Sequence, residues 1–198
     1  MKLFSFQTRN TSGQSTNNGQ WAMGLRTKTP PTPATVPQQV VVTPSPQIKV
    51  KWGPAVWFLF HTLSIKVRAD SFQSIRVELL KHIYSICTTL PCPICSEHAK
   101  GYLNGINFNT IQTKDDLQKL FWAFHNEVNQ IKGYPFFPFD QLHEKYSVAV
   151  TKNIIVYFMT HFSDRARSAK LLADDLVRAQ LCKLLKDWFN TNITAFEP

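Results

Sequence analysis

Residues 90–98 read Leu-Pro-Cys-Pro-Ile-Cys-Ser-Glu-His, and the rest of the chain is interpreted from this stretch. Its two cysteines, Cys92 and Cys95, are separated by two residues. Pro91 and Pro93 indicate a turn, and the run that follows them is compatible with a helix. We therefore expect a helix to begin here with Cys92 near its N-cap. Unpaired backbone N–H groups and the macrodipole at a helix start favour a thiolate. The stretch therefore predicts a reversible dithiol/disulfide centre.

The same segment also fits a zinc site. Cys87, Cys92, Cys95 and His98 have four, two and two residues between them. Such a set can supply four tetrahedral ligands. The segment alone does not distinguish a redox centre from a metal site, and the choice rests on the rest of the chain.

Composition and charge limit the class of protein. A chain of 198 residues with 43% apolar content is long enough for one domain with appendages. Six of the 22 Lys and Arg residues and none of the acidic ones lie in residues 1–51, so most of the +9 charge belongs to the N-terminal segment.

Four cysteines do not make a secreted disulfide framework. No apolar run is long enough for a membrane span, and we expect a soluble protein made in the cytosol.

The chain divides into three parts. Residues 1–48 are basic and rich in Pro, Ser, Thr and Gln, which predicts a disordered tail. Residues 49–146 form the predicted main domain, and residues 147–198 a C-terminal helical extension. Helical periodicity predicts helices over about 54–67, 72–88, 93–103, 113–132, 140–146, 148–162 and 166–189. No strand alternation is present, so the predicted fold class is all-α, with four helices bundled around the two cysteines.

Two polar clusters lie on helix faces that would be apolar if they only filled a core. Trp57 and His61 are one turn apart, and His125, Asn126 and Asn129 lie among aromatic and aliphatic residues. A single helical histidine is more often a satisfied core or surface residue. Two such clusters, both flanked by aromatics, favour a planar, hydrogen-bonding ligand held between helices.

Three motifs in order carry a family resemblance. They are Trp-Gly-Pro-x-x-Trp-x-x-x-His at 52–61, Leu-Pro-Cys-x-x-Cys at 90–95 and Phe-His-Asn-x-Val-Asn at 124–129. Residues 52–146 thereby resemble the Erv/ALR family of FAD-dependent sulfhydryl oxidases, and they look most similar to the short members carried by large cytoplasmic DNA viruses. The resemblance implies a four-helix bundle with a short fifth helix, FAD in the mouth of the bundle, and a homodimer.

The resemblance also implies roles for individual residues. Cys95 would be the cysteine next to the flavin, and Cys92 the distal one that exchanges with the thiols of substrate proteins. Oxygen would accept the electrons and become hydrogen peroxide. The residues that would hold FAD are Trp52, Trp57, His61, His125, Asn126, Val128, Asn129, Lys132 and Tyr146. Among these, Lys132 would face the pyrophosphate, and Tyr146 stands where many relatives have Trp.

The sequence departs from the cellular family pattern in its other cysteines. Only Cys87 and Cys182 remain, so no second structural pair or shuttle pair is expected, and the N-terminal tail has no cysteine. Two other readings stay open, namely a structural virion protein with this fold and a zinc-binding interaction module. The expected location is the host cytoplasm at the site of viral assembly, and the virion. A capsid or assembly partner would bind the tail and the C-terminal helices.

Overall fold

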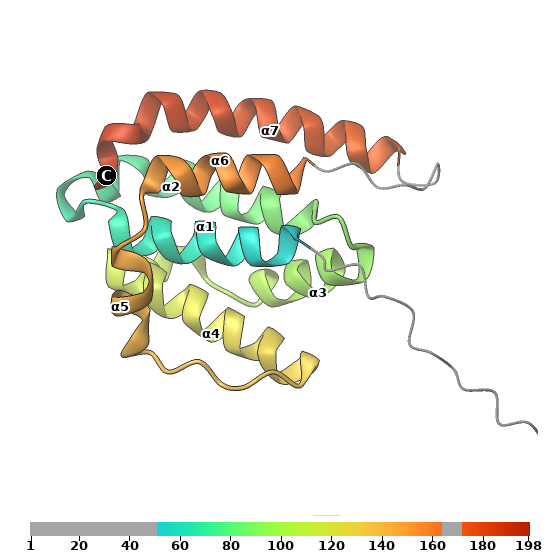
Figure 1. The fold of residues 1–198 in the computed structure, drawn as a ribbon, viewed down its shortest axis with the longest axis horizontal. Helices are drawn as coiled ribbons and strands as arrows, with labels where there is room; N and C mark the ends of the chain where they lie inside the picture. Colours follow the sequence, from blue (N-terminus) through green and yellow to red (C-terminus); the bar gives the residue numbers. More distant parts are fainter. Residues whose placement is uncertain (1–50, 164–171) are drawn as a thin grey trace, which may run out of the picture. The chain divides into compact units, whose positions relative to one another are not determined.

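The structure is a computed structural model that describes residues 51–163 and 172–198 (Figure 1). The described ranges contain the α-helices α1 Trp52–Lys66, α2 Ala69–Thr88, α3 Pro93–Asn104, α4 Lys114–Lys132, α5 Gln141–Ser147, α6 Thr151–Phe162 and α7 Leu172–Asn192. Short 3-10 helices lie between α3 and α4, at Phe108–Thr110, and after α7, at Ile193–Ala195. The all-α prediction is confirmed. The predicted tail over residues 1–48 and the predicted helix start at 166 lie outside the described residues.

Capping residues set the helix ends that matter for the site. Cys92 is the N-cap of α3, and its sulfur accepts a hydrogen bond from the backbone N–H of Cys95. Thr113 and Asp116 form a reciprocal capping box at the start of α4. Gly133 ends α4 with a φ of 68°, a left-handed conformation that glycine adopts without steric cost. The predicted N-cap position of Cys92 is confirmed, and the predicted helices over 93–103 and 113–132 agree with α3 and α4 to within one residue.

The second helix begins earlier than its apolar periodicity suggested. The predicted start was Phe72, whereas α2 starts at Ala69. The backbone N–H of Phe72 already donates to the carbonyl of Arg68 at 2.9 Å. Because the first turn of α2 is polar and exposed, hydrophobic periodicity does not register it.

Helix α1 is the centre of the bundle. Ten of its fifteen residues are buried, and they are spread around its circumference. A helix that is buried on all sides needs neighbours on all sides. Helices α4, α5 and α6 pack directly against α1, while α3 and α7 pack against α2 (Figure 1). The C-terminal helices therefore share the core of the bundle.

The apolar residues of α7 divide between a buried face and an exposed one. Leu181, Leu185 and Trp188 are buried, as expected for positions i, i+4 and i+7. Leu176 and Leu184 are 73% and 51% exposed. Since each residue turns a helix by about 100°, Leu184 points well away from the face of Leu185. The core-facing side of α7 is therefore narrower than its full set of apolar residues.

The last residues return to the junction of α1 and α2. Val67 and Phe196 form an antiparallel β-bridge. The N–H of Arg68 donates to the carbonyl of Ala195 at 2.8 Å, and the N–H of Glu197 donates to the carbonyl of Lys66 at 2.7 Å. We call residues 193–198 the C-terminal clasp. It closes the end of the bundle that lies opposite the start of α1.

Candidate functional site

Cys92 and Cys95 form a disulfide at the start of α3. Both are half-buried, while the nearby Cys87 is a buried free thiol. Burial raises the pKa of Cys87 to about 12, so this thiol stays protonated at neutral pH. Within residues 51–163 and 172–198, no three His, Cys, Asp or Glu side chains gather as metal ligands. The zinc set considered from the spacing therefore does not assemble in the structure.

A cavity of about 820 Å³ lies beside this disulfide. Its walls come from the start of α1, the turn before α3, the second half of α4 and the end of α5. Nine site residues predicted from the sequence line it, and these are Trp52, Trp57, Cys92, Cys95, His125, Val128, Asn129, Lys132 and Tyr146. The fold thus brings together in one cavity residues that lie up to 94 positions apart (146 − 52).

A smaller and more apolar slot of about 190 Å³ adjoins the cavity. Val56, Phe60 and Phe124 line it together with Cys95. Cys95 borders both spaces, whereas Cys92 borders only the larger one. Of the two sulfur-bearing residues, Cys95 is therefore the one next to the apolar interior.

His61 and His125 are paired at the back of the cavity. Nε2 of His61 lies 2.8 Å from Nδ1 of His125, and the Trp57 ring stacks on His125 with centroids 4.1 Å apart. His61 was also predicted to bind the cofactor, but it is fully buried and does not line the cavity itself. It stacks on Tyr146 at 4.7 Å. The pair links α1 to α4 and fixes the plane of His125.

Both imidazoles are neutral at physiological pH. Burial, the neighbouring His125 and the Lys145 charge lower the pKa of His61 to about 3. Burial and Lys145 lower the pKa of His125 to about 4. Nδ1 of His61 is buried without a hydrogen-bond partner in the structure. Flat, uncharged rings at a mainly apolar cavity fit a planar heteroaromatic ligand such as a flavin nucleotide.

Two lysines bring positive charge to the cavity. Lys132 ends α4, and Lys145 extends from α5 with its Nζ atom 4.7 Å from the Phe137 ring centroid. Lys132 was predicted from the sequence, whereas Lys145, Phe58 and Tyr134 were missed as lining residues. For Lys145, the available signal was its position next to Tyr146. The two ammonium groups suit a diphosphate.

Asn126 has a different place from the other predicted residues. Its side chain accepts from the N–H of Phe137 at 2.8 Å and donates to the carbonyl of Phe137 at 3.0 Å. The indole N–H of Trp122 donates to the same carbonyl at 2.8 Å. Asn126 does not line the main cavity. It instead holds the aromatic loop over residues 134–139 against α4.

In the part of the chain that the structure describes, no helix is long and apolar enough to cross a bilayer.

Comparisons with known proteins agree with this geometry. The Erv1 / Alr family profile matches residues 54–147. A "Probable FAD-linked sulfhydryl oxidase" of vaccinia virus strain Western Reserve is 30% identical over 102 residues, which are 51% of this chain and 90% of that protein. The "FAD-linked sulfhydryl oxidase" of a Malawi isolate of African swine fever virus is 29% identical over 111 residues, 56% of this chain and 92% of that protein. No solved structure matches the chain.

The match covers α1 to α5, which carry the disulfide and the lining residues of the cavity. Helices α6 and α7 lie outside it. The aligned part of the vaccinia relative reaches nearly its full length. The chain belongs to the Erv1 / Alr family.

Proposed function

We propose that this protein is an FAD-dependent sulfhydryl oxidase that forms disulfides in substrate proteins. The observation that carries the proposal is the Cys92–Cys95 disulfide on the wall of a cavity lined by aromatic, imidazole and ammonium groups. The names of the viral relatives support the same activity.

The two cysteines have separate tasks. A substrate thiolate attacks the sulfur of Cys92, the Cys92–Cys95 bond breaks, and Cys95 leaves as a thiolate. A second substrate thiol then displaces Cys92, so the substrate gains a disulfide and the enzyme holds two electrons as a dithiol. The start of α3 favours a thiolate in the dithiol, because the sulfur of Cys92 caps the helix and accepts from the N–H of Cys95, and both cysteines lie at the positive end of the helix dipole.

The cavity residues hold the cofactor. FAD bound in this cavity would supply the two-electron acceptor for the dithiol and the route to oxygen, with hydrogen peroxide as the product. Trp57 and His125 offer stacked ring surfaces, and Asn129 offers a buried amide. Lys132 and Lys145 neutralise the diphosphate. His61 and Asn126 do not line the cavity. His61 orients His125, and Asn126 holds the 134–139 loop in place.

The setting of the reaction follows from the family resemblance. We place the enzyme in the host cytoplasm at the site of viral assembly, and in the virion, as a homodimer. A capsid or assembly partner would bind through residues 1–48 and the C-terminal helices. The viral sources of the relatives support this setting.

The test is the absorbance spectrum of the purified protein together with oxygen consumption on dithiothreitol. We expect a flavin band at about 450 nm and peroxide formation in proportion to thiol loss. The Cys92→Ser/Cys95→Ser double variant should keep the band and lose turnover. A colourless protein with one zinc ion per chain would overturn the proposal.

A further inference from the structure

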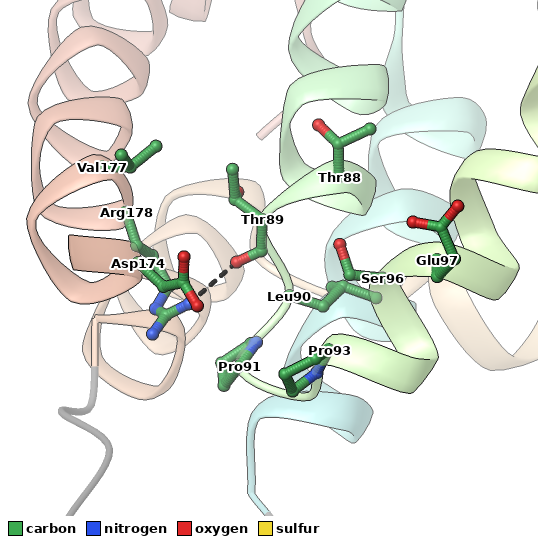
Figure 2. Close-up of a pocket in the computed structure, with 10 residues that line it drawn as sticks. All are labelled: Thr88, Thr89, Leu90, Pro91, Pro93, Ser96, Glu97, Asp174, Val177 and Arg178. Atoms are coloured by element: carbon green, nitrogen blue, oxygen red, sulfur yellow. Dashed lines mark hydrogen bonds between the residues drawn. The ribbon is translucent and has the colours of Figure 1, made fainter. Parts of the chain in front are cut away.

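Another pocket lies on the far side of the turn that carries Cys92 (Figure 2). Its volume is about 290 Å³. The end of α2, the turn, the first residues of α3 and one face of α7 line it, with Thr88, Thr89, Leu90, Pro91, Pro93, Ser96, Glu97, Asp174, Val177 and Arg178. Its α7 wall lies outside the residues that match the family. We call this pocket the elbow groove.

The groove is fixed to the redox centre by a buried arginine. Arg178 is only 3% exposed, and its Nη1 atom donates to the backbone carbonyl of Thr89 at 2.9 Å (Figure 2). The guanidinium also pairs with Asp175. A buried cation is tolerated because both partners compensate its desolvation. Through this contact, α7 is attached to the residue three positions before Cys92.

The turn separates the groove from the cofactor cavity. Pro91 and Pro93 line the groove, whereas Cys92 between them lines the cavity. A polypeptide in the groove would therefore contact both residues that flank Cys92 in the chain. The cofactor would lie on the other side of the turn, in the cavity that both cysteines line.

The walls of the groove define the chemistry of an occupant. Glu97 and Asp174 are exposed and stand on opposite sides of it, on α3 and α7 (Figure 2). Val177 is 55% exposed in the wall, where Leu90 and the two prolines of the turn also lie. The groove thus offers two carboxylates and an apolar strip. Its complement is an extended segment with an apolar and a basic side chain.

We propose that the elbow groove binds the polypeptide segment that flanks the reacting cysteine of a substrate protein, and that it selects segments with apolar and basic residues. The inference rests on the proposed oxidase activity and adds the recognition of its substrate. Helix α7 then takes part in substrate selection as well as in the core.

The test compares two synthetic dithiol peptides with dithiothreitol on the flavin-containing enzyme. One peptide has Leu and Lys beside its cysteine, and the other has Ser and Glu. We expect the KM of the first peptide to be about fivefold lower than that of the second, since two exposed charge contacts are each weak. The Glu97→Lys/Asp174→Lys variant should lose this preference and keep its turnover of dithiothreitol. Glu97→Gln/Asp174→Asn should lose most of the preference without reversing the charge.

A matched control keeps the charge change but moves it away from the groove. Asp115→Lys/Asp187→Lys alters two exposed carboxylates, one of them on α7, and should leave the peptide preference unchanged. Equal KM values for both peptides on the wild-type enzyme would overturn the inference, and so would an unchanged preference in both groove variants. Failure of the wild-type enzyme to oxidise dithiothreitol would instead contradict the proposed function.

Discussion

Nε2 of His61 lies 2.8 Å from Nδ1 of His125, so one neutral imidazole donates a hydrogen bond to the other across α1 and α4. Protonation of both rings removes the acceptor and places two positive charges in contact. Burial is the largest cause of both low pKa values; His125 and Lys145 add to it for His61, whose pKa is about 3, and Lys145 adds to it for His125, whose pKa is about 4.

The pair predicts a loss of stability at acidic pH. Each histidine has a folded-state pKa below its ordinary value of 6.5, so the unfolded chain binds more protons than the folded one below that pH. The stabilisation is present above pH 6.5 and is lost as the pH falls towards about 4. We expect the melting temperature of His61→Phe to depend less on pH in this window than that of the wild type.

The control for removing an imidazole is His143→Gln, because His143 is exposed. Its melting profile between pH 7.5 and 4.5 should follow the wild type. Identical slopes for His61→Phe and the wild type would show that the buried pair does not govern acid stability.

The cysteines predict two different spectra. Cys95 borders the apolar slot as well as the cavity, so its thiolate is the one placed to give a long-wavelength charge-transfer band with bound flavin. Cys92→Ser should show this band and Cys95→Ser should not, while both lose thiol oxidation. A band in Cys95→Ser alone would mean that Cys92 is the cysteine next to the flavin and Cys95 the one that exchanges with substrate thiols.

The two cavity lysines predict a loss of cofactor affinity. A charge-assisted contact to phosphate is worth about 1.5–3 kcal/mol, so Lys132→Ala and Lys145→Ala should each weaken FAD binding by about tenfold or more. Reconstitution of the flavin-free protein with FAD, followed by fluorescence, measures this. The exposed Lys119→Ala and Lys152→Ala serve as controls. Unchanged affinity in both cavity variants would exclude a diphosphate at this position.

Neighbouring leucines on α7 provide a direct test of its packing. Leu185 is fully buried in the common core, whereas Leu184 is 51% exposed. Leu185→Ala should cost about 2–5 kcal/mol of unfolding free energy, because it leaves a cavity between α7 and α2. Leu184→Ala should change it by less than about 0.5 kcal/mol. Urea denaturation compares the two, and similar values would mean that α7 is not part of the core.

Local signals in the sequence predict the start of α3 and both ends of α4 well. The N-cap at Cys92, the capping box at Thr113 and the left-handed Gly133 are decided by residues within one turn of each other. Periodicity does not give the width of the buried face of a helix, because that width depends on the elements that pack against it. Leu184 of α7 is apolar and yet 51% exposed.

The remaining features depend on tertiary contacts. Lys145 enters the cavity only because α5 folds back against α1, and no motif indicates that return. Asn126 belongs to a recognisable motif, yet its bonds to the backbone of Phe137 need a loop whose path is set by packing. The contact of Arg178 with the carbonyl of Thr89 joins residues 89 positions apart and leaves no local pattern.

The C-terminal clasp gives this fold a late step in its assembly. Val67, at the end of the central helix, meets Phe196, which is synthesised 129 residues later (196 − 67). Contacts of such long sequence separation slow folding, since a long loop must close before they form. On the ribosome, α1 to α5 would emerge with the α6 and α7 faces of their core still open. The core is therefore completed only after residues 193–198 have left the exit tunnel.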